Sequence, residues 1–156
     1  ARMPSPIFKK IQIELIIQRA IDFYKMSSNN EIILNSEKKK NYINGDEEQL
    51  YRVFINLIKN SEDSLAEKKE KNKHFKGKIN IEINVNKEYI DVSLADNGIG
   101  IEDTTKIMTP YFTTKTTGTG LGLPIVSKII NEHKGELIIS NNNPGAKILI
   151  SIPKIN

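Results

Sequence analysis

The chain has 156 residues, of which 38% are hydrophobic, and 23 basic against 19 acidic side chains give a formal net charge of +4. This length suits one domain, and the composition is too apolar for a disordered chain. The absence of cysteine excludes a disulfide scaffold, a cysteine-ligated metal and a catalytic thiol. Because 20 of the basic residues are Lys and only 3 are Arg, the positive charge is weak evidence for nucleic-acid recognition.

The order of the predicted elements indicates an α/β domain. The segment at residues 1–10, which contains two prolines, is assigned to a linker, and residues 11–156 are assigned to one domain. Apolar residues at helical spacing predict helices at 14–25, from 46 until the pattern fades in 67–78, and at about 121–134. Alternating or short apolar runs predict strands at 11–13, 31–35, 41–44, 79–85, 89–95, 136–141 and 146–152. No apolar run approaches the length of about 18 residues that a membrane helix needs, and no signal-peptide pattern opens the chain.

The first candidate site segment is Asn56-Leu57-Ile58-Lys59-Asn60 on the long predicted helix. Asn56 and Asn60 are four residues apart, so both amides lie on one helix face, beside the apolar stripe. Asn is a mediocre helix former, so the pair indicates either a binding role or two surface amides in an Asn-rich chain.

The second segment, Asp96-Asn97-Gly98-Ile99-Gly100, directly follows a predicted strand. A carboxylate at a strand end can point into a pocket, and the glycines beyond it allow the backbone to approach a ligand closely. The same residues also suit a plain strand-terminating turn.

The third segment, Gly118-Thr119-Gly120-Leu121-Gly122-Leu123, opens a predicted helix. The unpaired N–H groups and the dipole of a helix N-terminus both favour an anion. The spacing of the glycines matches neither the Walker A motif nor the dinucleotide fingerprint.

Together with Pro110-Tyr111-Phe112-Thr113-Thr114-Lys115, these segments resemble the N, G1, F and G2 boxes of the ATP-binding domain of sensor histidine kinases, in the gyrase–Hsp90–kinase–MutL superfamily. The four boxes match in order and spacing across residues 46–152, and the Pro110 to Lys115 segment is similar to the nitrogen-regulation, NtrY-like branch. The resemblance implies a two-layer α/β sandwich, with a mixed sheet of about five strands packed on three helices and a mobile ATP lid over residues 101–120.

The same resemblance implies ATP and Mg²⁺ as ligands. Asp96 would accept a hydrogen bond from the adenine amino group, and Asn60 and Asn56 would ligate or orient Mg²⁺, with Asn60 as the metal ligand. Lys115 would lie near the γ-phosphate, so Asn60 and Lys115 are the implied catalytic residues. The other residues implied to bind the nucleotide are Asn97, Gly98, Gly100, Thr114, Gly118, Thr119, Gly120, Leu121 and Gly122.

The choice between kinase and hydrolase depends on one position. Hydrolases of this superfamily carry a Glu one helical turn before the box Asn, and here that position is Asn56, whose amide cannot accept a proton. The resemblance therefore implies a catalytic domain that transfers the γ-phosphoryl of ATP to a histidine in a separate dimerisation domain. Neither His74 nor His133 lies in a segment like the phosphoacceptor box, so we expect a catalytic fragment of a longer sensor. His133 is interpreted as a structural residue at a helix end.

The implied partners are the dimerisation and phosphoacceptor helices of the parent kinase and, through them, a response regulator. We expect a monomeric fragment that lies in the cytoplasm, makes no contact with the membrane or nucleic acid, and belongs to a parent anchored in the inner membrane. The alternatives are a catalytically inactive nucleotide-binding switch module and an ATP hydrolase of the same superfamily. A basic nucleic-acid binder that uses Lys68 to Lys78 is a weaker alternative.

Overall fold

The computed structural model describes residues 4–37, 39–101 and 122–156. Within them the chain forms three helices, α1 (Ile13–Lys25), α2 (Glu47–Lys71) and α3 (Gly122–Glu132). The strands are β1 (Lys9–Gln12), β2 (Glu31–Ser36), β3 (Tyr42–Gly45), β4 (Lys78–Val85), β5 (Tyr89–Asp96), β6 (Glu136–Asn141) and β7 (Ala146–Ile155).

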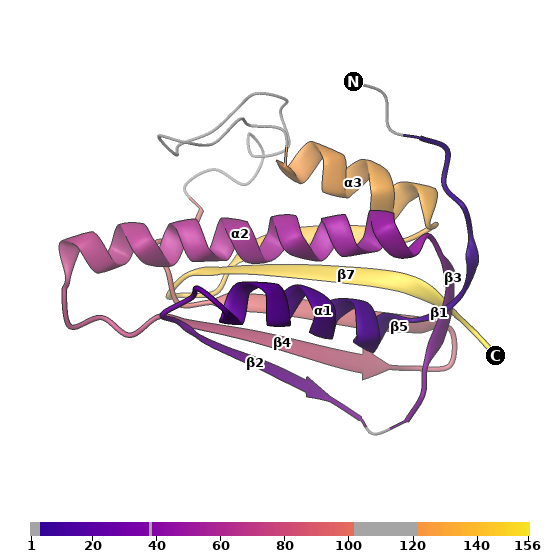
Figure 1. Cartoon of the computed structure of the whole chain (residues 1–156), viewed down its shortest axis with the longest axis horizontal. Coiled ribbons are helices and arrows are strands. Elements are labelled where there is room, and N and C mark those ends of the chain that lie inside the picture. Colours follow the sequence, from indigo (N-terminus) through magenta and orange to yellow (C-terminus); the bar gives the residue numbers. More distant parts are fainter. Residues whose placement is uncertain (1–3, 38, 102–121) are drawn as a thin grey trace.

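The strands form one mixed sheet, and the helices lie together on one side of it (Figure 1). The strand order is β1-β3-β7-β5-β4-β2, and β6 also pairs with β7. Strands β2 and β4 are parallel, and the other pairs are antiparallel. The predicted two-layer α/β architecture is thereby confirmed.

The strand count of about five, implied by the resemblance, is too low, because the described sheet has seven strands. The number of strand-like segments in the sequence agrees with the structure. The short strands β1 and β3 pair with each other over four residues and join β7 through only two residue pairs, Tyr42 with Ile155 and Ile43 with Lys154. Residues Lys9 and Lys10, within the range assigned to a linker, already belong to β1.

The core lies between the sheet and the helices. Ile79, Ile81 and Ile83 of β4 point into it, as the alternation predicts. The longest helix, α2, contributes fully buried residues at helical spacing, among them Leu50, Phe54, Leu57, Ile58 and Leu65.

Asp46 determines where α2 begins. Its carboxylate accepts the N–H of Gln49 with Oδ1 at 3.0 Å and the N–H of Ile7 with Oδ2 at 2.8 Å, and Glu47 and Glu48 favour the positive end of the helix dipole. Burial opposes ionisation of Asp46, but these hydrogen bonds outweigh it and hold the pKa of the carboxyl below its ordinary value. Asp46 is therefore the N-cap of α2, and it also anchors the segment that leads into β1.

Candidate functional site

Asp96, the residue predicted to bind adenine, lies at the end of β5 with its side chain on the helix-covered face of the sheet. Leu94 and Asp96 are buried, whereas Ala95 between them points to the other face. Asp96 is only 5% exposed. A carboxylate removed from water in this way requires donors or a cation, and among the described residues no Lys or Arg forms an ion pair with it.

Neutral donors surround the Asp96 carboxylate instead. The hydroxyl of Ser61 on α2 donates to Oδ2 at 2.9 Å, and the N–H of Gly98 donates to Oδ1 at 2.9 Å. The N–H of Ala146, at the start of β7, donates a longer bond to Oδ1 at 3.3 Å. A carboxylate has about four acceptor sites, so capacity remains for a donor from a ligand.

Helix α2 also holds the loop that follows Asp96. The Oγ of Ser64 accepts the N–H of Ile99 at 3.0 Å, and the amine of Lys68 donates to the carbonyl of Asn97 at 2.8 Å. A Cβ at Gly98 would lie only 2.2 Å from the Ser64 Oγ. The close approach of the loop to α2 therefore depends on a glycine at this position.

The turn between β6 and β7 closes the opposite side of the same loop. The side chain of Asn141 accepts the N–H of Ile101 at 2.7 Å and donates to its carbonyl at 2.8 Å. Gly145 has a φ of +92°, and a Cβ there would lie 1.9 Å from the backbone oxygen of Asp96. Gly100, with a φ of +80°, lies next to this turn. The surroundings of Asp96 thus come from three separate parts of the chain.

Helices α2 and α3 run antiparallel (Figure 1). His133, directly after α3, accepts the N–H of Asp46 with Nε2 at 3.0 Å, which leaves Nδ1 to donate to the carbonyl of Ile129 at 2.7 Å. Since α3 has 11 residues and rises about 1.5 Å per residue, its first residue, Gly122, lies roughly three turns along α2, level with Asn56 to Asn60. His133 is therefore a structural residue, as predicted, and fixes the start of α3 beside the Asn pair.

The Asn pair lies in one row along α2 with Ser64, the residue that binds the loop after Asp96. Asn56, Asn60 and Ser64 follow one another at intervals of four along α2, and the two asparagines are half-buried. Because Ser64 contacts the loop after Asp96, this row leads from the start of α3 to that loop. The described parts of three predicted segments therefore lie along α2: the Asn pair, the loop 96–100 and, from the third segment, the start of α3 at Gly122.

Two carboxylates, Glu62 and Asp63, follow Asn60 on α2, and both have partners within the chain. Asp63 forms an ion pair with Lys59 at 3.0 Å. Glu62, two residues after Asn60, lies on the α1 side of α2, and its two oxygens accept hydrogen bonds from the Ser28 hydroxyl at 2.5 Å and the Asn30 amide at 2.6 Å. Burial, followed by the negative charges of Asp63 and Glu62, raises the pKa of Tyr24 in this region to about 12. Glu62 thus has structural partners on the flank away from the Asn pair.

Several predicted site residues lie outside the described residues: Thr114, Lys115, Gly118, Thr119, Gly120 and Leu121. The same holds for the predicted lid at 101–120, apart from Ile101. Gly122 is described, and a Cβ there would meet no described atom within 4 Å.

The sequence reasoning missed five residues that hold Asp96 and its loop: Ser61, Ser64, Lys68, Asn141 and Ala146. The sequence pattern could have pointed to Ser61, because it is a polar residue on the core-facing side of α2, in phase with Leu57, Ile58 and Leu65. An unpaired hydroxyl is unfavourable at such a position. Ala146 acts through its backbone, so its side chain gives no indication.

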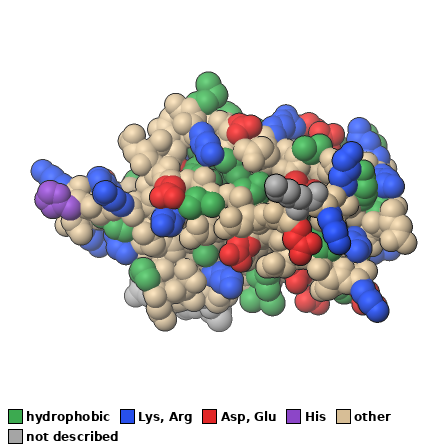
Figure 2. Space-filling view, turned by 90° about the horizontal axis from the view of Figure 1, so that it is seen from below, with side chains coloured by type: hydrophobic (Ala, Val, Ile, Leu, Met, Phe, Trp, Pro, Cys, Tyr) green, Lys and Arg blue, Asp and Glu red, His purple; other side chains and the backbone are tan. Residues whose placement is uncertain are grey.

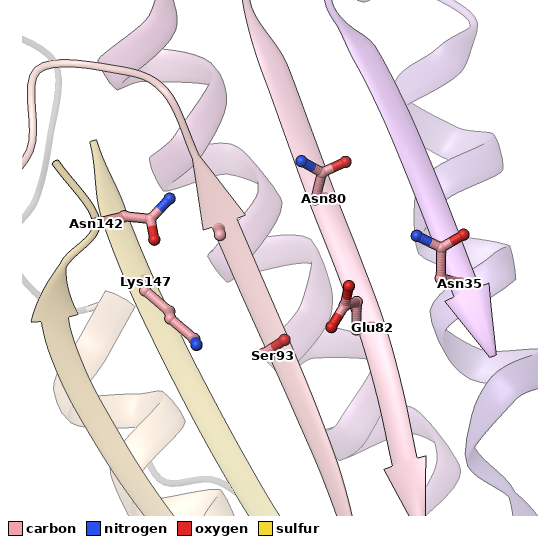
Figure 3. Close-up of a pocket in the computed structure, with 7 residues that line it drawn as sticks. Asn35, Asn80, Glu82, Ser93, Asn142 and Lys147 are labelled. Carbon is pink, nitrogen blue, oxygen red and sulfur yellow. The ribbon is translucent and has the colours of Figure 1, made fainter. Parts of the chain in front are cut away.

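The opposite face of the sheet carries a polar hollow of about 360 Å³, lined by Asn35, Asn80, Glu82, Ser93, Ala95, Asn142 and Lys147. Figure 3 shows these side chains in front of the sheet, with the helices behind it. None of the predicted site residues that the structure describes lines this hollow.

The Lys-rich segment after the Asn row makes contacts within the chain. Lys68 binds the loop after Asp96, and the amine of Lys69 donates to the carbonyl of Phe75 at 2.8 Å. On the face shown in Figure 2, basic and acidic side chains are interspersed. No continuous basic surface is visible in that view.

Residues 45–156 match the sequence model of the family described as histidine kinase-, DNA gyrase B- and HSP90-like ATPase. The chain is 32% identical to a putative sensor histidine kinase NtrY-like of Rickettsia bellii, over 96% of this chain and 24% of that protein. It is 39% identical to sporulation kinase A of Bacillus subtilis, over 76% of this chain and 19% of that protein. The chain thus spans about a quarter or less of the length of these relatives.

The fold is similar to the solved, nucleotide-free catalytic domain of histidine kinase ThkA. The TM-score is 0.81 at 27% identity, and the match covers 95% of this chain and 98% of that one. The similarity therefore extends over nearly the whole domain, including the helix-covered face that carries Asp96.

Proposed function

Since the chain belongs to the family of histidine kinase-, DNA gyrase B- and HSP90-like ATPases, we propose that it is the catalytic domain of a sensor histidine kinase. In this proposal the domain binds ATP with Mg²⁺ and presents the γ-phosphoryl group to a histidine of a separate dimerisation domain. The names of the relatives, which are sensor and sporulation kinases, support this choice within the family.

The observation that carries the proposal is the buried carboxylate of Asp96. Its charge is compensated only by neutral donors among the described residues, and it retains capacity for another. The amino group of adenine is a neutral donor, and a charge-assisted hydrogen bond to it is strong and directional. Asp96 would therefore select adenine, and the loop at Asn97 to Gly100 would pass along the base.

The residues present also fit Mg²⁺. This ion prefers oxygen ligands, keeps several waters and is often held by one or two protein groups together with substrate phosphates. The half-buried amides of Asn56 and Asn60 supply such oxygens level with the start of α3, where unpaired N–H groups favour phosphates. The described residues contain no cluster of three or more His, Cys, Asp or Glu side chains that could hold a metal without a nucleotide. Bound Mg²⁺ would neutralise the charge of the phosphates.

Transfer to an external histidine is favoured over hydrolysis. Asn56 stands where a hydrolase of this superfamily would place its basic Glu, and an amide cannot take a proton from water. Glu62 is held by Ser28 and Asn30 on the other flank of α2. Positioning of the nucleotide is then the main contribution of this domain to phosphoryl transfer, with Lys115 proposed near the γ-phosphate.

The proposed partners are the dimerisation and phosphoacceptor helices of the parent kinase and, through them, a response regulator. We propose a cytoplasmic location for this domain and an inner-membrane anchor elsewhere in the parent. None of the helices in the described parts of the chain is long and apolar enough to span a membrane.

Calorimetry with a non-hydrolysable ATP analogue tests the binding part of the proposal. We expect a one-to-one complex that requires Mg²⁺ for full affinity. Titration with and without Mg²⁺ at matched ionic strength separates the metal effect from screening by salt. The absence of binding at millimolar nucleotide with Mg²⁺ present would refute the proposal.

A further inference from the structure

Ser61 is a polar residue at a core position of α2 to which the proposed function assigns no role. It is 3% exposed and lies in phase with Leu57, Ile58 and Leu65. A hydroxyl buried in this way is costly unless it forms a hydrogen bond, and Ala would be a better helix former at the same place. Ser61 therefore has a role that an apolar residue could not fill.

The hydroxyl of Ser61 donates to the Asp96 carboxylate, and to one particular oxygen of it. Oδ1 already accepts the N–H groups of Gly98 and Ala146, at 2.9 and 3.3 Å. Oδ2 accepts only Ser61, at 2.9 Å, among the described residues. Because each carboxylate oxygen has about two acceptor sites, the remaining capacity lies on Oδ2.

The hydroxyl also fixes the orientation of that oxygen. The terminal torsion of Asp is broad, so two backbone N–H groups on Oδ1 alone leave the carboxylate plane loosely defined. A third donor, placed on the other oxygen by a rigid helix, determines the plane. The direction of the open acceptor site on Oδ2 is thereby set by α2.

We infer that Ser61 is a specificity-determining positioning residue: its hydroxyl aims Oδ2 of Asp96 at the amino group of the purine base. Ser61 acts through Asp96 and does not itself bind the base. The inference rests on the proposed function, in which Asp96 accepts that amino group. It predicts that Ser61 affects discrimination between bases rather than the affinity for the triphosphate.

The test compares ATP with purine riboside triphosphate, which is the same molecule without the amino group. Dissociation constants with Mg²⁺ are measured for the wild type, Ser61→Ala, Ser61→Thr and the control Ser93→Ala. Ser93 lies on the same strand as Asp96 but on the opposite face of the sheet (Figure 3). Thermal unfolding of each variant shows that it is folded.

We expect Ser61→Ala to weaken ATP binding by about tenfold and to change the affinity for the analogue by less than about twofold. Ser61→Thr retains the hydroxyl and should keep most of the preference for ATP, and Ser93→Ala should match the wild type. An equal loss for both ligands in Ser61→Ala would show a structural role only and overturn the inference. Unchanged binding of both ligands would overturn it as well.

The variant Asp96→Asn separates this inference from the proposed function. If Asp96→Asn loses the preference for ATP while Ser61→Ala keeps it, the inference about Ser61 fails and the proposed function stands. If the wild type binds neither triphosphate, the proposed function fails and the inference about Ser61 fails with it.

Discussion

At the scale of single residues, the carboxylates of Glu62 and Asp96 have different surroundings. The Glu62 carboxylate is shared by a hydroxyl and a side-chain amide on the flank that faces α1. Asp96 is held by a hydroxyl and two backbone N–H groups on the flank that faces the loop after β5. The first arrangement ties α2 to the segment after α1, and the second leaves an acceptor site for a ligand.

The assignment of Asp96 predicts a selective loss in Asp96→Asn. An amide can still accept a hydrogen bond but lacks the charge, so ATP binding should weaken by roughly 1–3 kcal/mol. Inorganic triphosphate lacks the base, and its affinity should change little. Calorimetry with both ligands measures the difference, and equal losses for the two would contradict the role of Asp96.

The raised pKa of Tyr24 predicts that the stability of the fold depends on pH. Because the pKa of Tyr24 is raised from 10.0 to about 12 in the folded chain, the folded state holds the phenolic proton more tightly than the unfolded state. The resulting stabilisation is complete below pH 10 and is lost as the pH rises towards 12.

Tyr24→Phe lacks this dependence and also the hydrogen bond from the hydroxyl to the carbonyl of Ile55. Near neutral pH the variant should be less stable by about 1 kcal/mol. Urea unfolding at several values between neutral pH and pH 11 should show the wild type losing its advantage as the pH rises. A constant or widening difference would exclude the raised pKa.

At the scale of elements, the β6–β7 turn lies between two predicted strands, and the sequence reasoning assigned it no role in the site. Gly145 combines a φ of +92° with a close approach to the backbone of Asp96. Ala at this position would be strained in its backbone and would displace either the turn or the end of β5.

Gly145→Ala should therefore destabilise the fold by roughly 2–4 kcal/mol. Gly122→Ala is the matched control for stability, because a Cβ there meets no described atom within 4 Å and the φ is not in the left-handed region. Chemical denaturation of both variants tests the contrast. Similar stabilities for Gly145→Ala and Gly122→Ala would show that the close packing of the turn against the backbone of Asp96 does not stabilise the fold.

The helices and strands themselves could be predicted largely from local patterns. The helix predicted at 14–25 is observed as Ile13–Lys25, and the strand predicted at 79–85 as Lys78–Val85. The contacts that build the site could not be predicted from local patterns, because Ser61 and Asp96 are 35 residues apart in the sequence and Asn141 and Ile101 are 40 residues apart. Such pairings follow from tertiary packing and leave no periodicity in the sequence.

At the scale of the whole molecule, the fold brings the described parts of the predicted boxes, namely the Asn pair, the loop 96–100 and the start of α3, to the helix-covered side of the sheet. Helix α3 is fixed to α2 by His133 at one end, and the loop after β5 is fixed to α2 by Ser64 and Lys68. Both connections use α2 as the common support. The order of the boxes along the chain led to the candidate site, whereas the residues that hold its described parts together required the structure.

The domain should need an external nucleophile. The ring nitrogens of His133 are engaged with Asp46 and Ile129 at the end of α3 away from Gly122, and His74 lies in the exposed loop after α2. Neither is placed to receive a phosphoryl group at the Asn row. Transfer to a histidine on separate helices should be slow, because a tether would normally supply the effective concentration.

The decisive measurement for the proposed function is phosphoryl transfer from γ-labelled ATP to the separately expressed dimerisation domain of the parent kinase. We expect label on the histidine of that domain, none on this chain, little release of inorganic phosphate, and loss of transfer in Asn60→Ala. Ser93→Ala serves as the control that retains transfer. Rapid phosphate release by this chain alone, or stable label on His133, would contradict the account.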